Sequence, residues 1–165
     1  MLYAAYGSNL HPIRLTQRIT SAALVATAFL PKWSLRFHKR SKDDSGKCNI
    51  VRGSDGVRVA IFDVSIEDKR TLDQIEGVGF GYAEALLQVP GIGECHTYVA
   101  EEGYVDEALR PYDWYRELVL GGARFHGFPQ DYLKAIESIG ARPDPDAHRS
   151  AREWQTVDRF RTAGA

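Results

Sequence analysis

Residues 3–10 (YAAYGSNL) lie close to the start of the chain, and they restrict the possible folds. Small and aromatic residues up to Tyr6 predict a buried strand, and the next three residues, Gly7, Ser8 and Asn9, predict an abrupt turn. Pro12 then suits the first turn of a helix. A strand that passes through a turn into a helix directs several backbone N–H groups into one concavity, which can bind a carboxylate or a developing oxyanion. The alternative is an ordinary corner between a strand and a helix.

Two residues of this turn bear on its chemistry, Gly7 through its lack of a side chain and Ser8 through its hydroxyl group. Gly7 has no Cβ, so it can adopt a left-handed conformation and let a ligand approach the main chain. Ser8 could be taken for a nucleophile, but no G-x-S-x-G sequence surrounds it and no histidine has a suggestive position. We therefore expect Ser8 to serve the turn and to hydrogen-bond a ligand.

The rest of the chain alternates between strand-like and helix-like patterns. Period-2 alternation and short apolar runs predict strands at residues 22–30, 33–40, 48–51, 57–64, 82–89 and 94–100. The first of these strands is expected to be buried, and the last two to form a hairpin. Helical patterns occur at residues 11–19, 65–76, 112–120 and 130–139. This order predicts an α+β fold: a small, curled, barrel-like sheet, mixed or antiparallel, with helices packed against it.

The chain has the length and the charge balance of one globular domain without a nucleic-acid partner. It has 165 residues, 44% of them apolar and 26% charged, with a formal charge of −1. Such a charge gives no preference for nucleic acid or an anionic membrane. We predict one domain over residues 1–140 and a C-terminal arm over residues 141–165. The arm should be partly helical or flexible, with a short helix at about 147–154, because its sequence is rich in Pro, Asp, Arg and Ala.

Cysteine spacing and the absence of targeting patterns predict the location. Cys48 and Cys95 are far apart and match no metal-binding spacing, which is typical of reduced thiols in the cytoplasm. The start of the chain lacks the pattern of a signal peptide, and no apolar run is long enough to span a bilayer. We therefore expect a cytoplasmic protein, a monomer or a homodimer, that binds no metal or other cofactor.

Glu76 is the carboxylate that the sequence singles out. It falls in the last turn of the predicted 65–76 helix, immediately before Gly77, which should end that helix. A carboxylate there faces the negative end of the helix dipole, and its position on the edge of the apolar stripe predicts partial burial. Both effects disfavour the ionised form, as is common for a functional carboxylate. The alternative is a surface glutamate at a frayed helix end.

Two segments together resemble a known family. Residues 6–10 (YGSNL) after a short strand, with residues 72–78 (LDQIEGV) downstream, resemble the gamma-glutamylcyclotransferase family, in its Y-G-S-N-L branch with an AIG2-like fold. The resemblance covers Leu2 to about Gly140, and the first segment differs from the loop of the glutathione-degrading branch. It implies a small barrel-like sheet with a pocket at its mouth. It also implies that Glu76 is the catalytic acid/base.

The resemblance extends to the residues that would bind the substrate. It implies binding by the opening stretch, through Tyr3, Tyr6, Gly7, Ser8, Asn9 and Leu10, and by Tyr115 before a helix end rich in small residues. Tyr115 could instead be a packing aromatic, and for Tyr82 we consider packing the better interpretation.

The family chemistry needs few protein groups. A gamma-glutamyl compound carries its own nucleophile, so the attack of its alpha-amino group on the gamma-carbonyl would release 5-oxoproline without a covalent enzyme intermediate. One carboxylate can take the proton from the attacking nitrogen and return a proton to the leaving nitrogen. The Gly7–Asn9 amides would bind the substrate carboxylate or the oxyanion. The predicted partner is therefore a small gamma-glutamyl amino acid, peptide or amine.

Other readings remain open. A non-catalytic protein of the same fold could bind gamma-glutamyl or carboxylate ligands, and a hydrolase or transferase could use the same site. Residues 36–42 (RFHKRSK) are basic; we expect a solvated strand end there, or else a contact with an acidic part of the substrate near the pocket mouth. A thiol–imidazole pair between His38 and Cys48 is a further, weaker possibility. Residues 45–49 depart from the family pattern that we can align, which leaves the identity of the substrate open.

Overall fold

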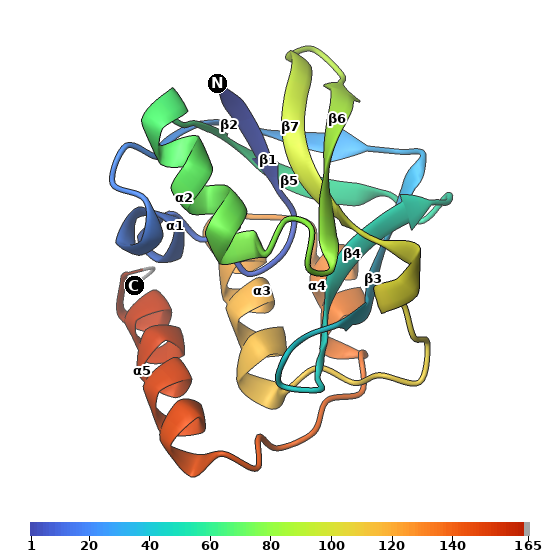
Figure 1. The fold of residues 1–165 in the computed structure, drawn as a ribbon, viewed down its shortest axis with the longest axis vertical. Coiled ribbons are helices and arrows are strands. Elements are labelled where there is room, and N and C mark those ends of the chain that lie inside the picture. The colour runs from blue at the N-terminus through green and yellow to red at the C-terminus, as the bar shows by residue number, and fades with distance from the viewer. Residues whose placement is uncertain (164–165) are drawn as a thin grey trace.

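The computed structural model describes residues 1–163, and within that range it contains seven strands, five α-helices and a short 3-10 helix (Figure 1). The strands are β1 (Leu2–Ala5), β2 (Ala23–Leu30), β3 (Trp33–Arg40), β4 (Gly46–Arg52), β5 (Val57–Asp63), β6 (Tyr82–Val89) and β7 (Gly93–Ala100). The helices are α1 (Pro12–Arg18), α2 (Ile66–Glu76), α3 (Asp113–Phe125), α4 (Gln130–Glu137) and α5 (Ala147–Ala163), with the 3-10 helix at Glu102–Tyr104.

The strands form two neighbouring sheets. The larger has the order β2-β5-β1-β7-β6, and the smaller consists of β3 and β4. β1 runs antiparallel to β5 and parallel to β7, and the other pairs are antiparallel. The predicted α+β class with a mixed, curled sheet is confirmed, although the curled sheet does not close into a barrel. The predicted hairpin is also present, as β6 and β7.

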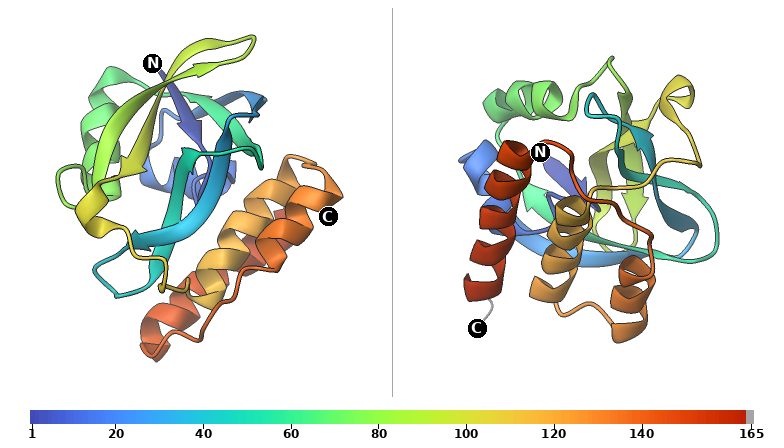
Figure 2. Two further views of the ribbon diagram at one scale, coloured as in Figure 1. Left: turned by 90° about the vertical axis from the view of Figure 1, so that its right-hand side faces the viewer. Right: turned by 90° about the horizontal axis from the view of Figure 1, so that it is seen from below.

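Helices α3, α4 and α5 form a layer on one side of the curled strands (Figure 2). α3 lies between α4 and α5, and its apolar side chains Leu118, Val119 and Ala123 are fully buried. From α5, Val157 and Phe160 join the same core. The helix predicted at about 147–154 therefore continues to Ala163, because its second half also carries an apolar face that packs on α3.

Residues 22–30 form a strand as predicted, but the prediction that this strand is buried is wrong. β2 is the edge strand of the larger sheet and pairs only with β5, so one of its sides has no neighbouring strand. Leu24, Val25 and Phe29 are 43–55% exposed. An apolar run of this length can belong to a buried or an exposed strand, and the periodicity does not distinguish them.

Helix α2 ends where the sequence predicted. Ser65 caps its start by accepting a hydrogen bond from the N–H of Asp68, and Gly77 ends it in the left-handed conformation with φ of 74°. Ile66, Leu72 and Ile75 fit the apolar stripe of a helix, but only Leu72 is fully buried and the other two are exposed. Glu76 is the last residue of the helix, and its side chain is 18% exposed.

Candidate active site

The turn at residues 7–10 joins β1 to the start of α1. The N–H of Leu10 donates to the carbonyl of Gly7 at 3.0 Å, which closes the turn. The N–H groups of Gly7, Ser8 and Asn9 donate to no protein acceptor within the described residues 1–163. Helix α1 begins only at Pro12, after His11 has capped it. The free amides therefore belong to the turn itself and not to the end of a helix.

Gly7 does not have the backbone conformation that we predicted. Its φ is not positive, so the left-handed conformation expected from the sequence is not adopted. A Cβ at this position would instead lie 3.1 Å from Cβ of Cys48 and 3.5 Å from the hydroxyl oxygen of Tyr115. Glycine thus allows β1, β4 and α3 to meet closely at the cavity.

A narrow inner cavity opens beside this turn. Its volume is about 30 Å³, enough for about two water molecules. It is lined by Tyr3, Tyr6, Gly7, Ser8, Asn9, Cys48, Glu76, Tyr82, Tyr98 and Tyr115. The structure thus brings together all the site residues predicted from the sequence except Leu10. Leu10 is fully buried and packs against Gly122 of α3, away from the cavity lining.

Glu76 is held in place by two side chains from the start of the protein. Its Oε1 accepts a hydrogen bond of 2.7 Å from the Asn9 amide and lies 3.7 Å from a guanidinium nitrogen of Arg18. Arg18 in turn donates to the amide oxygen of Asn9 at 2.9 Å. Asn9 therefore donates a hydrogen bond to this carboxylate, and Arg18 places a positive charge beside it. Glu76 is the only carboxylate among the described residues that line the inner cavity.

The five tyrosines of the inner cavity are neutral hydrogen-bonding groups. Burial raises the pKa of each hydroxyl well above its usual value near 10, and the neighbouring carboxylate of Glu76 adds to the shift. Tyr82 donates to the carbonyl of Cys48, whose N–H donates to the hydroxyl of Tyr115 at 3.1 Å. Tyr3 accepts from the Asn9 amide at 3.2 Å. The cavity wall is therefore polar but uncharged around one carboxylate.

Cys48 lines the cavity without the properties of a nucleophile. Burial raises the pKa of its thiol to about 12, so it stays protonated near neutral pH. The possible pair of Cys48 with His38 is wrong, because both ring nitrogens of His38 have other partners. Nδ1 lies 2.6 Å from a carboxylate oxygen of Glu107, and Nε2 lies 3.0 Å from the Asn49 amide nitrogen.

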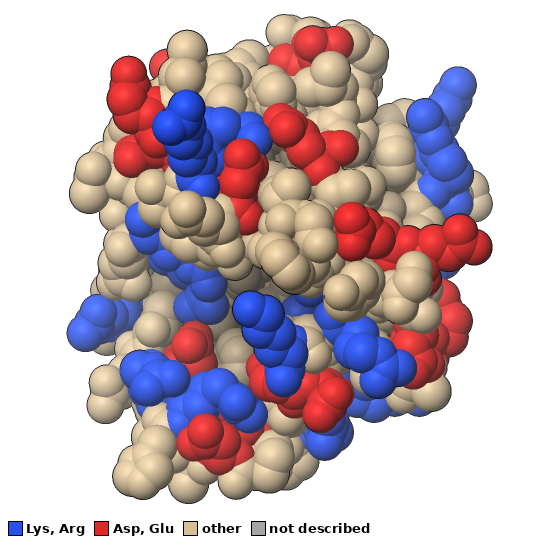
Figure 3. Space-filling model, in the orientation of Figure 1, with Lys and Arg blue, Asp and Glu red and all other residues tan. Residues whose placement is uncertain are grey.

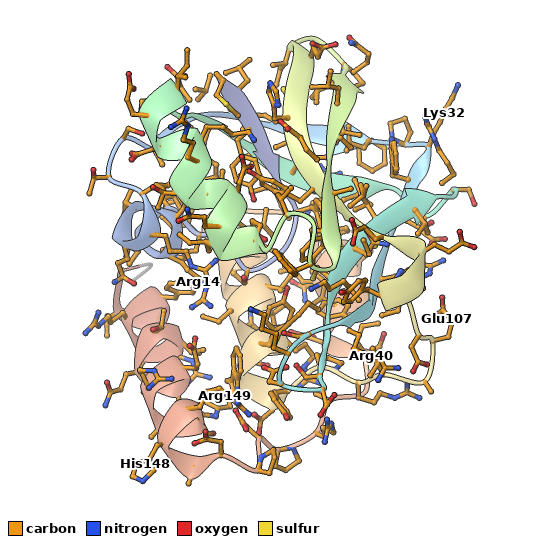
Figure 4. All side chains as sticks on the ribbon, in the orientation of Figure 1. Arg14, Lys32, Arg40, Glu107, His148 and Arg149 are labelled. Atoms are coloured by element: carbon orange, nitrogen blue, oxygen red, sulfur yellow. The ribbon has the colours of Figure 1, made fainter. Side chains whose placement is uncertain are left out.

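An outer cavity of about 280 Å³ lies against the inner one. The two share Ser8, Glu76, Tyr82 and Tyr115. The outer cavity also reaches Arg14, Arg18, Lys39 and Lys47, together with Arg149 and Glu153 from α5. Figure 3 shows Lys, Arg, Asp and Glu side chains around a hollow on this face. Figure 4 shows Arg14 and Arg149 on the side of α5 that faces α3.

Four residues that line the inner cavity or contact Glu76 were not predicted to do so. Tyr82 was interpreted as a packing residue, Cys48 was considered only as a possible partner of His38, and Arg18 and Tyr98 received no site role. Tyr82 and Tyr98 come from facing strands β6 and β7, so the hairpin pattern could have placed them near each other but not near Glu76. Arg18 ends the short helix that follows the turn, and only the fold brings it to α2.

Neither a metal-binding cluster nor a membrane-spanning helix occurs in residues 1–163. Within this range, no group of three or more His, Cys, Asp or Glu side chains is arranged to hold a metal ion. None of the described helices is both long enough and apolar enough to cross a membrane.

Known proteins resemble this chain over most of its length. Residues 56–136 match the model of the AIG2-like family. Human gamma-glutamylcyclotransferase is 30% identical over 150 residues, which cover 82% of this chain and 78% of the human protein. The bovine gamma-glutamylcyclotransferase is 28% identical over 149 residues, covering 84% of this chain and 78% of that protein.

A solved structure also resembles the fold of this chain. A structure described as gamma-glutamyl cyclotransferase superposes with a TM-score of 0.84 at 25% identity, and the match covers 96% of this chain and 98% of that chain. The similarity of the two folds therefore extends over nearly the whole chain.

Proposed function

The chain belongs to the gamma-glutamylcyclotransferase family, and on this basis we propose that it converts a gamma-glutamyl amino acid, peptide or amine to 5-oxoproline and a free amine. The proposed general base and acid is Glu76. Tyr3, Tyr6, Gly7, Ser8, Asn9 and Tyr115 are proposed to hold the gamma-glutamyl half, which is too large for the inner cavity alone and would extend into the outer one. The structure does not bring Leu10 to the cavity, so Leu10 is left out of this set.

The reaction forms one bond and breaks another at the same carbon. The alpha-amino nitrogen of the substrate attacks the gamma-carbonyl carbon, and the bond from that carbon to the leaving nitrogen breaks. The attacking alpha-ammonium group loses two protons in all, and the released amine gains both. Because the nucleophile and the carbonyl belong to one molecule, binding in a bent conformation supplies much of the rate enhancement.

The observation that carries the proposal is the position of Glu76 at the junction of the two cavities. The scissile bond separates the gamma-glutamyl half from the leaving group, so a proton carrier must reach both nitrogens. A carboxylate that lines both cavities meets that requirement. The neighbours Asn9 and Arg18 fix its orientation, and the surrounding tyrosine hydroxyls do not compete for protons because they stay neutral.

The turn at residues 7–10 supplies the second requirement, stabilisation of negative charge. The N–H groups of Gly7, Ser8 and Asn9 lie beside the inner cavity and have no protein acceptor within residues 1–163. They can bind the substrate's alpha-carboxylate or the oxygen of the tetrahedral intermediate. Loss of one such donor typically costs about 10²–10³-fold in turnover.

The test is product analysis with a panel of gamma-glutamyl dipeptides and gamma-glutamyl amines. We expect 5-oxoproline and the free amine in equal amounts, measured by mass spectrometry, from at least one compound. Glutamate in place of 5-oxoproline would instead indicate hydrolysis. Saturable binding without any product would favour a non-catalytic binding protein.

A further inference from the structure

Three of the five tyrosines that line the inner cavity donate their hydroxyl hydrogen to a protein acceptor. Tyr6 donates to the carbonyl oxygen of Tyr98, and Tyr82 donates to the carbonyl oxygen of Cys48. Tyr98 itself donates to Oδ1 of Asp73 at 2.7 Å. A tyrosine hydroxyl has a single hydrogen, so these three oxygens can only accept hydrogen bonds from a ligand.

Asp73 differs from the other two acceptors because it is a side chain and not a main-chain carbonyl. It lies on α2, three residues before Glu76, and its side chain is 30% exposed. Its Oδ1 also accepts from Nζ of Lys69 at 2.5 Å, and Lys69 lies 3.2 Å from a carboxylate oxygen of Glu84 on β6. Contacts from α2 and β6 therefore hold the Asp73 carboxylate against the Tyr98 hydroxyl.

Tyr98 connects Asp73 to the inner cavity. It is 3% exposed, and its ring centre lies 5.8 Å from that of Tyr3, whose hydroxyl shares the Asn9 amide with Glu76. Burial raises the pKa of the Tyr98 hydroxyl well above its usual value, and the hydrogen bond to Asp73 adds to the shift. The hydroxyl therefore keeps its hydrogen. Asp73 lines neither the inner nor the outer cavity, so any effect on a ligand passes through Tyr98.

The attacking nitrogen of the proposed reaction needs hydrogen-bond acceptors around it. As an ammonium group it has three N–H bonds, and Glu76 takes one proton at a time. The nitrogen attacks only when its lone pair faces the gamma-carbonyl carbon, and acceptors that hold the remaining N–H bonds keep it in that orientation. A hydroxyl that donated its hydrogen to this lone pair would oppose the attack.

We propose that Asp73 is a positioning residue: by holding the hydroxyl hydrogen of Tyr98, it leaves the Tyr98 oxygen as an acceptor for the alpha-ammonium group of the substrate. This inference rests on the proposed function. Without an acceptor at position 73, the hydroxyl would be free to rotate, because its hydrogen is not otherwise fixed. Its hydrogen would then compete for the lone pair of the attacking amine.

The test is a double-mutant cycle on the gamma-glutamyl dipeptide that the wild type converts fastest to 5-oxoproline, with gamma-glutamylalanine tried first. Asp73→Leu keeps the bulk that excludes water but provides no acceptor. We expect its kcat to fall about 10-fold, as for one misplaced hydrogen bond. In a Tyr98→Phe protein, which has no hydroxyl to orient, the same substitution should not lower kcat further. Gln74→Ala, on the adjacent exposed residue, should have the kcat of the wild type.

Asp73→Asn separates the acceptor from the charge, and it also serves if Asp73→Leu does not fold. Its amide oxygen can still accept from Tyr98, and the Lys69 ammonium group favours the oxygen on that side. We therefore expect Asp73→Asn to retain most of the wild-type kcat. A loss of 10-fold or more in an Asn variant whose thermal unfolding matches wild type would count against the inference.

The other outcomes separate this inference from the proposed function. No 5-oxoproline from any compound of the panel would overturn the proposed function, and the inference with it. A wild-type kcat in Asp73→Leu would overturn the inference alone. So would an equal loss on Asp73→Leu with and without the Tyr98 hydroxyl, because Asp73 would then act through α2 and not through Tyr98.

Discussion

Gly7 lies where the backbone turn, Cys48 and Tyr115 converge on the inner cavity. Its lack of a side chain leaves space that any larger residue would fill. We predict that Gly7→Val retains the fold but loses measurable binding of 5-oxoproline in calorimetry, because its methyl groups would enter the cavity. The crowding of Cys48 should cost about 1–3 kcal/mol of unfolding free energy.

Gly103 provides a matched control for Gly7. A Cβ at Gly103 would meet no atom within 4 Å, and the residue is exposed. Gly103→Val should therefore bind 5-oxoproline as the wild type does. If Gly7→Val also bound with wild-type affinity, the 7–10 turn would not hold the gamma-glutamyl half.

His11 links the site turn to the helical layer and should make stability depend on pH. It caps α1 by accepting a hydrogen bond from the N–H of Ile13, and its ring stacks on Phe160 at 3.8 Å between centres. Burial, with a smaller contribution from His126, lowers the pKa of His11 from 6.5 to about 4. Between these values the unfolded chain binds more protons than the folded protein does, so stability falls as the pH falls from about 6.5 to about 4.

We predict that His11→Asn, which keeps a capping side chain, loses less unfolding free energy between pH 7 and pH 4.5 than the wild type loses. Urea unfolding at the two pH values measures this difference. His148→Asn, on an exposed residue, should show the wild-type dependence. Equal losses in the wild type and His11→Asn would show that His11 is not the group responsible.

At the scale of elements, α5 completes both the core and the site. Its Phe160 ring fills the space above Gly121 of α3, where a Cβ would lie 2.9 Å from Cδ2 of Phe160. Arg149 and Glu153, which lie nearer the start of α5, line the outer cavity. The boundary that we predicted at residue 140 stays a prediction, but α5 is packed against the preceding helices.

We predict that Phe160→Ala lowers the unfolding free energy by about 3–5 kcal/mol, the usual cost of removing a buried aromatic ring. Arg159→Ala, on the adjacent exposed residue, should stay within about 0.5 kcal/mol of wild type. Urea denaturation of the three proteins at one pH gives the comparison. Similar unfolding curves for the two variants would mean that α5 contributes little to the core.

Local sequence patterns predicted the elements well where the pattern had one physical cause. The capping of α2 by Ser65 and its end at Gly77 were predicted correctly, because both depend on residues within one turn of the chain. The burial of β2 and the length of α5 were not, because both depend on which distant segment packs against them. Residues 36–42 were considered as a possible contact with the substrate near the pocket mouth, but only the fold shows that Lys39 and Ser41 of this stretch line the outer cavity.

At the scale of the whole molecule, the site depends on long-range pairing. β1 lies between β5 and β7, which places the 7–10 turn beside the hairpin that carries Tyr82 and Tyr98. Asn9 and Glu76 are 67 residues apart in sequence and form a hydrogen bond. The sequence identified both segments through the family resemblance, but no periodicity could show that they touch. Their joint position at the cavity is what the proposed mechanism requires.

The most direct test of the mechanism is Glu76→Gln. The amide keeps the size of the side chain but cannot carry a proton, and it removes a negative charge from the C-terminal end of α2. We predict that turnover to 5-oxoproline falls by about 10²–10⁴-fold while binding of substrate and folding are retained. Single-turnover kinetics with calorimetric binding on the same preparation measures both quantities. Near-normal turnover in the Gln variant would contradict the account, and loss of binding together with turnover would make Glu76 a ligand-holding or structural residue.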